Sequence, residues 1–177
     1  SSQDLIAPAA PFVRSVLNDS TNRITVTWAA NTEPDLKGYR IYSSANGTTW
    51  TLQKNESVLG PKATSYSFTG ISSTIPFYFK MTAVDSAAIT NESGSSDVYG
   101  VRPNLPGKKV LLVDAFDRTS GSYKKLWHPF AMTAGQSVNA RYETAHDRAV
   151  TDGSVKLSNY DAVVWLFGDE SSTDETF

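Results

Sequence analysis

The stretch KKVLLVDAFDR at residues 108–118 decides the fold. Four consecutive apolar residues, from Val110 to Val113, lie between two lysines and an acidic turn. A short apolar run bounded in this way predicts a strand that is buried on both faces, as in parallel sheets. A second run of the same kind, AVVWLF, follows at residues 162–167. No run of this kind precedes residue 108, so the sequence predicts a change of architecture there.

The residues after this stretch alternate between predicted strands and predicted helices. Residues 140–144 predict a strand between the two apolar runs, and residues 123–134 and 147–157 predict helices. Buried strands that alternate with helices favour parallel βαβ units with right-handed crossovers. Residues 108–177 hold only three such strands and the start of a third helix. We therefore expect the N-terminal part of an α/β parallel-sheet domain that is truncated.

The residues before this stretch predict an all-β sandwich. The segment RITVTW at residues 23–28 alternates, which places Ile24, Val26 and Trp28 on one buried face. Seven such short strands occur at a spacing of roughly 10–15 residues, with turn residues between them. The segment RPNLPG at residues 102–107 ends the series and predicts a short, semi-rigid linker. The predicted units are an extension at 1–7, a sandwich at 8–103, a linker at 104–107 and the α/β part at 108–177.

The first half resembles a fibronectin type III domain. The residues that carry this resemblance are ITVTW at 24–28, EPDLKGYRIY at 33–42, SFTGI at 67–71 and FYFKMTAVDSAAITNES at 77–93. The resemblance implies an immunoglobulin-like sandwich that spaces, orients or binds. The chain departs from the family at Phe77, which stands where the family has its corner tyrosine and lacks a hydroxyl group. The neighbouring Tyr78 is expected to face outward.

The second half resembles a flavodoxin-like or amidotransferase-like α/β segment. The segments that carry this resemblance are VLLVDAFDR at 110–118, YDAVVWLFGDES at 160–171 and TDETF at 173–177. Similar segments follow fibronectin type III domains in exported Bacteroidetes proteins labelled xanthan lyase or N-acetylmuramoyl-L-alanine amidase. The resemblance implies an exported protein, which is extracellular, on the cell surface or periplasmic. It also implies that catalysis in such proteins belongs to a separate domain.

Composition excludes several functional classes. The net charge is −2 and no basic cluster stands out, which argues against a nucleic-acid partner. No apolar run reaches the length of a membrane span, so no membrane insertion is expected. The absence of cysteine excludes thiol catalysis and thiolate metal sites within these 177 residues.

Acidic side chains follow two of the predicted parallel strands. Sites in open α/β sheets form beyond the carboxyl ends of the strands, and a 2-1-3 strand order would make these two strands neighbours. Such carboxylates could share a proton as general acid and base, or bind Mg²⁺ or Ca²⁺. No cofactor is otherwise predicted. Alternatively, these residues cap turns and helices. The candidate catalytic residues are Asp114, Asp117, Asp169 and Glu170; candidate metal ligands are Asp114, Asp117 and Asp169; Arg118, His128 and His146 could join them.

Trp50 is the candidate binding residue of the sandwich. One interpretation is an exposed aromatic platform for a sugar ring. The other is a tryptophan that packs on Tyr42 or on the edge of the sheet.

The sequence therefore predicts a non-catalytic accessory segment for binding or scaffolding, within an exported bacterial protein that acts on polysaccharide or cell wall. One alternative is part of a hydrolase or lyase whose α/β domain is completed by residues beyond 177. Another is a structural surface-array or adhesion module. The expected partners are other domains of the same parent protein, and polysaccharide or peptidoglycan.

Overall fold

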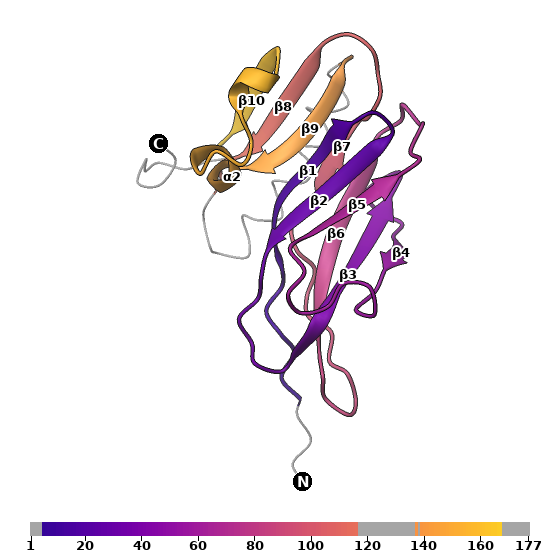
Figure 1. Cartoon of the computed structure of the whole chain (residues 1–177), viewed down its shortest axis with the longest axis vertical. Coiled ribbons are helices and arrows are strands. Elements are labelled where there is room, and N and C mark those ends of the chain that lie inside the picture. Colours follow the sequence, from indigo (N-terminus) through magenta and orange to yellow (C-terminus); the bar gives the residue numbers. More distant parts are fainter. Residues whose placement is uncertain (1–4, 117–136, 138, 168–177) are drawn as a thin grey trace.

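The computed structural model describes residues 5–116, 137 and 139–167, and the fold is mostly β (Figure 1). Seven strands precede residue 108, as the alternating sequence predicts. They are β1 (Phe12–Ser20), β2 (Arg23–Ala29), β3 (Leu36–Ser44), β4 (Thr51–Lys54), β5 (Ser65–Thr69), β6 (Phe77–Asp85) and β7 (Tyr99–Val101). The second half contributes β8 (Lys109–Asp114), β9 (Arg141–His146), the helix α2 (Asp147–Thr151), a 3-10 turn (Leu157–Asn159) and β10 (Ala162–Leu166).

Two antiparallel layers form a fibronectin type III-like sandwich. One layer is a four-stranded sheet in the order β4-β3-β6-β7, and the other contains β1, β2 and β5. Alternate residues of each layer meet in one core, which includes Trp28, Tyr39 and Met81. Trp28 and Tyr39 pack edge to face, with ring centroids 5.5 Å apart. Trp28 is therefore buried, as predicted. The face of β6 that carries Met81 also points into the core, as predicted.

The three strands of the second half extend the layer that contains β1. The sheet runs in the order β10-β8-β9-β1-β2-β5. Both β9 and β10 pair with β8 in parallel, which confirms the expected parallel pairs. The order of the three strands is 2-1-3, the order that makes the first and third of them neighbours. β9 then pairs with β1 in antiparallel fashion, with Ser15 opposite Ala145 and Val16 opposite Thr144. One mixed sheet thus joins the two halves of the chain, and Figure 1 shows β9 beside β1.

The segment between β7 and β8 is tied to the sandwich. Asn104 adopts a left-handed backbone conformation with φ of 59°. Its side-chain oxygen accepts a hydrogen bond from the Asn22 amide at 2.9 Å, and its amide group donates to the Ile71 and Ser73 carbonyls. Its backbone N–H donates to Oδ1 of Asn18 at 2.9 Å. These bonds fix the direction in which the chain leaves the sandwich.

Three local expectations were wrong. Tyr78 does not face solvent: it is 2 % exposed, because its ring lies over Gly100 and Tyr142 of β9 lies beside it. β10 is not fully buried, because it is the outermost strand of this sheet in the described part of the chain. The helix predicted at 147–157 ends at Thr151, and Gly153 then adopts a positive φ of 80° that suits a turn.

Candidate functional site

The outer face of the four-stranded sheet carries the first candidate site. Tyr42 on β3 lies opposite Lys80 on β6 and opposite Leu52 on β4, so these side chains share one face. Arg40 and Thr82 form the next pair along the same strands. The residues between them, such as Ile41 and Met81, point into the core. We refer to Arg40, Tyr42, Trp50, Lys80, Thr82 and Glu92, together with Glu56, as the outer-face cluster.

Hydrogen bonds hold the polar half of this cluster in place. The Arg40 guanidinium binds both carboxylate oxygens of Glu56, at 2.8 and 3.0 Å, and donates to Glu92 at 2.6 Å. The hydroxyls of Tyr42 and Thr82 donate to the other oxygen of Glu92, at 2.7 and 2.6 Å. Such charge-assisted, partly bidentate bonds fix side-chain positions before any ligand arrives.

Three ionisable groups of the cluster keep their usual protonation states around neutral pH. Hydrogen bonds from Arg40 lower the pKa of Glu56 to about 2. Burial alone would raise the pKa of the Glu92 carboxyl, but the hydroxyls of Thr82 and Tyr42 and the charge of Arg40 lower it on balance. Burial and the bond to Glu92 raise the pKa of the Tyr42 phenol. Both carboxylates are therefore ionised and the phenol keeps its proton near neutral pH.

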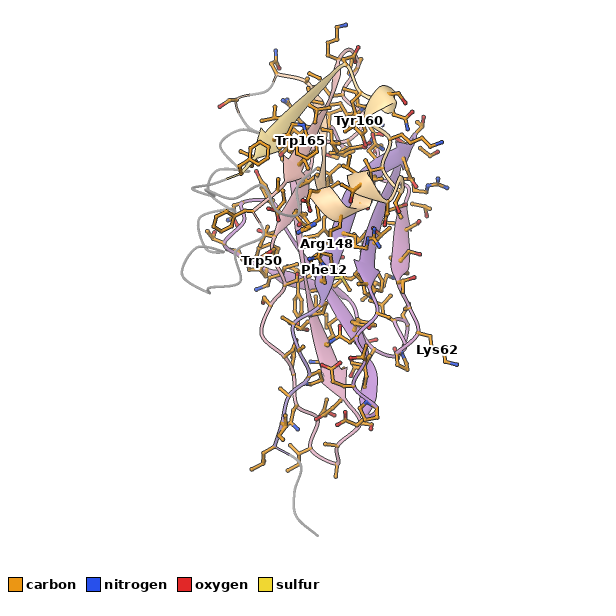
Figure 2. All side chains as sticks on the ribbon, turned by 90° about the vertical axis from the view of Figure 1, so that its left-hand side faces the viewer. Phe12, Trp50, Lys62, Arg148, Tyr160 and Trp165 are labelled. Atoms are coloured by element: carbon orange, nitrogen blue, oxygen red, sulfur yellow. The ribbon has the colours of Figure 1, made fainter. Side chains whose placement is uncertain are left out.

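Trp50 is half-buried beside this polar network, and Figure 2 labels it. The Lys80 ammonium lies 4.7 Å from the centroid of the Trp50 ring and 5.8 Å from that of Tyr42. The two rings therefore share one cation on the surface of the sheet. The Trp50 ring thus lies against Lys80 and is partly exposed, and both interpretations of it stay predictions.

Asp114 lies where the parallel-strand rule places a site, at the carboxyl end of β8. It is 2 % exposed, and its oxygens accept hydrogen bonds from the Tyr99 hydroxyl at 2.8 Å and the Phe116 amide at 3.1 Å. Burial raises the pKa of Asp114 to about 7, with further contributions from the charges of Asp97 and Asp147. The bond to Tyr99 crosses from the second half of the chain to the sandwich.

His146 and Asp147 lie at the end of the neighbouring strand. His146 is opposite Asp114 in the register of β8 and β9, and it caps the helix α2 by accepting a hydrogen bond from the Arg148 amide. Its Nδ1 lies 2.7 Å from an oxygen of Asp147. Within the described residues, no group of three or more histidine or carboxylate side chains is arranged to hold a metal ion.

The remaining candidates, Asp117, Arg118, His128, Asp169 and Glu170, lie outside the described residues. Of the carboxylates predicted to converge, the structure thus places Asp114. The candidate His146 lies opposite it in the neighbouring strand, and the structure adds Tyr99 and Asp147. Sequence reasoning missed Tyr99 and Asp147. An acidic residue directly after His146, where a helix begins, was an available signal for Asp147. Nothing in the local sequence links Tyr99 to Asp114.

Comparison with known proteins finds solved structures with a similar fold over part of this chain. No family model and no curated protein matches the chain. A β-1,2-glucanase from Parabacteroides distasonis is 25 % identical over 60 % of this chain and 14 % of its own, with a TM-score of 0.49. A fibronectin type III-like protein from Clostridium thermocellum is 25 % identical over 58 % of this chain and 97 % of its own, with a TM-score of 0.40. The spore cortex lytic enzyme SleM of Clostridium perfringens is 24 % identical over 50 % and 28 %, with a TM-score of 0.35.

The chain thus spans a small part of the glucanase it resembles. Among the described residues, no helix has the length and apolar character needed to cross a membrane.

Proposed function

We propose that this chain is a non-catalytic accessory segment of an exported bacterial protein that acts on polysaccharide or cell wall, and that the outer-face cluster binds the glycan. The observation that carries the proposal is the juxtaposition of Trp50, Tyr42 and Lys80 with the ordered network around Glu92.

A sugar ring presents an apolar C–H face and a rim of hydroxyl groups. A large, rigid aromatic side chain supplies contact area to the apolar face at a small cost in conformational entropy. Fixed polar groups beside it orient the hydroxyls, as in other ligand sites that combine apolar surface with a few placed polar groups. Trp50 can provide the first element, and Lys80 and Glu92 the second.

The connection between the two halves supports an accessory role. The shared sheet and the bonds of Asn104 leave little freedom between the sandwich and the parallel strands. A binding face held in this way keeps a constant orientation relative to the second half of the chain, and so to any domain that packs against that half. Such an orientation is useful to a segment that presents a polymer to another domain of the same protein.

Co-sedimentation of the whole chain with insoluble peptidoglycan and with insoluble polysaccharides tests the proposal. We expect the wild-type chain to sediment with at least one of them, and the Trp50→Ala variant to remain in the supernatant. Lys62→Ala is the surface control and should sediment like wild type, because Lys62 is exposed and lies across the molecule from Trp50 in Figure 2. The absence of sedimentation with every polymer, for the chain and its parent protein alike, would refute the binding role.

A hydrolase or lyase is the second candidate function, and the environment of Asp114 favours it. A buried carboxyl with a pKa of about 7 suits proton transfer near neutral pH. Its two oxygens are already bonded to Tyr99 and to the Phe116 amide, however, which is the pattern of a structural group. We expect no turnover of peptidoglycan or polysaccharide by this chain; turnover that Asp114→Asn abolishes would favour the enzyme.

A further inference from the structure

We propose that Asn46 is a modification site: its side-chain amide converts to a carboxylate through a cyclic imide with the Gly47 nitrogen, and the Ser44 hydroxyl holds this reaction back in the folded chain. The sequence contains one Asn-Gly pair, at residues 46 and 47. A glycine after asparagine offers the least steric hindrance to such a ring, because it has no Cβ. The pair lies in the segment that joins β3 to β4 and leads to Trp50.

The reaction is intramolecular and needs only water. The Gly47 nitrogen gives its proton to water or hydroxide and attacks Cγ of Asn46, so that an N–Cγ bond closes the ring. The Cγ–Nδ2 bond then breaks, and the departing nitrogen takes up a proton and leaves as ammonia. Water adds to either carbonyl of the imide and reopens it, which gives aspartate or isoaspartate with one new negative charge.

In the folded chain, the Gly47 N–H is directed at Ser44. It donates to the Ser44 Oγ at 2.8 Å, and the Asn46 N–H donates to the same oxygen at 3.2 Å. The nitrogen is planar in the peptide, and it is also planar in the imide, so the new bond to Cγ takes the place of the N–H bond. Oγ of Ser44 therefore occupies the direction from which Cγ has to approach, and the hydroxyl must move before the ring can close.

Hydrogen bonds also hold the side chain that has to be attacked. Oδ1 of Asn46 accepts from the Thr48 and Thr49 amides at 2.9 and 2.8 Å, and from the Ser44 hydroxyl at 3.0 Å. Because Cγ carries this oxygen, a rotation that brings Cγ to the Gly47 nitrogen gives up these bonds. Ser44 thus restrains both reacting groups, the nucleophile as an acceptor and the carbonyl as a donor.

The restraint is local, so a local fluctuation is enough to release it. Every hydrogen bond named above lies within residues 44–49. Ser44 is 5 % exposed, but most of the segment after it is exposed to solvent: Ala45, Asn46, Thr48 and Thr49. A short exposed segment opens at a lower free energy than the whole chain unfolds. The folded chain therefore reacts slowly at Asn46, and does so without global unfolding.

Peptide mass spectrometry of the full chain, sampled during incubation in mildly alkaline buffer, tests the proposal. The replacement of the amide by a carboxylate changes the mass of the peptide that contains Asn46. We expect this conversion to be at least about tenfold slower in the folded chain than in the same chain unfolded in guanidinium chloride. We also expect Ser44→Ala to accelerate the conversion in native buffer by about fivefold or more, because it removes the restraint on both groups.

Two variants separate the role of Ser44 from a general loss of stability. Ser57→Ala is the matched control: the Ser57 hydroxyl and amide bond to Oδ1 of Asn55 in the same manner, but glutamate follows that asparagine. Asn104→Ala removes hydrogen bonds far along the chain from this segment. Both variants should convert Asn46 at the wild-type rate.

Equal rates for the folded and the unfolded chain would overturn the proposal, and so would a wild-type rate in a folded Ser44→Ala variant. An acceleration in Asn104→Ala as large as that in Ser44→Ala would show that global stability, and not the Ser44 hydroxyl, controls the site. Earlier conversion at another asparagine of the folded chain would contradict the assignment to Asn46. Should Ser44→Ala fail to fold, the comparison of the folded and unfolded wild-type chain decides.

Discussion

The replacement Asp114→Asn should make the chain more stable at alkaline pH. Asparagine keeps the shape of the side chain: its oxygen can accept from the Phe116 amide, and its amide group can donate to the Tyr99 hydroxyl oxygen. It removes only the ability to ionise. The variant therefore mimics a permanently protonated Asp114.

The magnitude follows from the pKa of the buried carboxyl. Burial raises the pKa of Asp114 from 3.8 to about 7 in the folded chain. The unfolded chain thus releases this proton first as the pH rises, so the stability contributed by protonated Asp114 is complete below pH 3.8 and is lost by about pH 7. Each pKa unit corresponds to about 1.4 kcal/mol, which gives at most about 3 kcal/mol between pH 5 and pH 8.

Urea unfolding followed by tryptophan fluorescence measures this difference, because Trp28 lies in the core of the sandwich. Measurements at or above pH 5 avoid the range in which the Glu56 carboxyl takes up protons on unfolding. We expect wild type to lose more free energy of unfolding between pH 5 and pH 8 than Asp114→Asn, and the variant to be the more stable protein at pH 8. Parallel pH profiles for the two proteins would refute the assignment of Asp114 as a buried, largely desolvated acid.

Two further substitutions test the connection and the packing. Asn104→Ala removes three side-chain hydrogen bonds and places alanine at a positive φ, so it should lower the free energy of unfolding by about 2–4 kcal/mol in urea titrations; an unchanged midpoint would show that the linker is not held by these bonds. Gly38→Ala brings a Cβ to 2.2 Å from the Leu59 carbonyl oxygen, which forces backbone movement and should cost more than about 1 kcal/mol. Gly60→Ala, whose Cβ meets nothing within 4 Å, is the matched control and should show no such loss.

Much of the architecture followed from local sequence patterns. Alternation at residues 23–28 predicted the buried face of β2, and the apolar run around Val110–Val113 predicted a strand of a parallel sheet that is buried on both faces. A 2-1-3 order was the condition under which the carboxylates after the first and third parallel strands would lie together, and the structure has that order. These features depend on side-chain periodicity, which a sequence displays directly.

The features that could not be predicted are contacts between distant segments. The pairing of β1 with β9 joins residues 15 and 145, and no local pattern marks either as an edge partner. The same contact explains why Tyr78 is buried, since β9 runs beside β7 there. Asp114 was identified from its place after a strand, whereas its partner Tyr99 depends on the same long-range arrangement. The partial exposure of β10 likewise depends on its place in the sheet order.

The proposed glycan role depends most directly on Trp50. The decisive measurement is the dissociation constant of the chain for a soluble fragment of the polymer that it sediments with, for wild type, Trp50→Ala and Lys62→Ala. We expect Trp50→Ala to weaken binding at least about tenfold, which corresponds to about 1.4 kcal/mol, while Lys62→Ala leaves it unchanged. Equal dissociation constants for wild type and Trp50→Ala would contradict the account and move the binding surface away from the outer face of the four-stranded sheet.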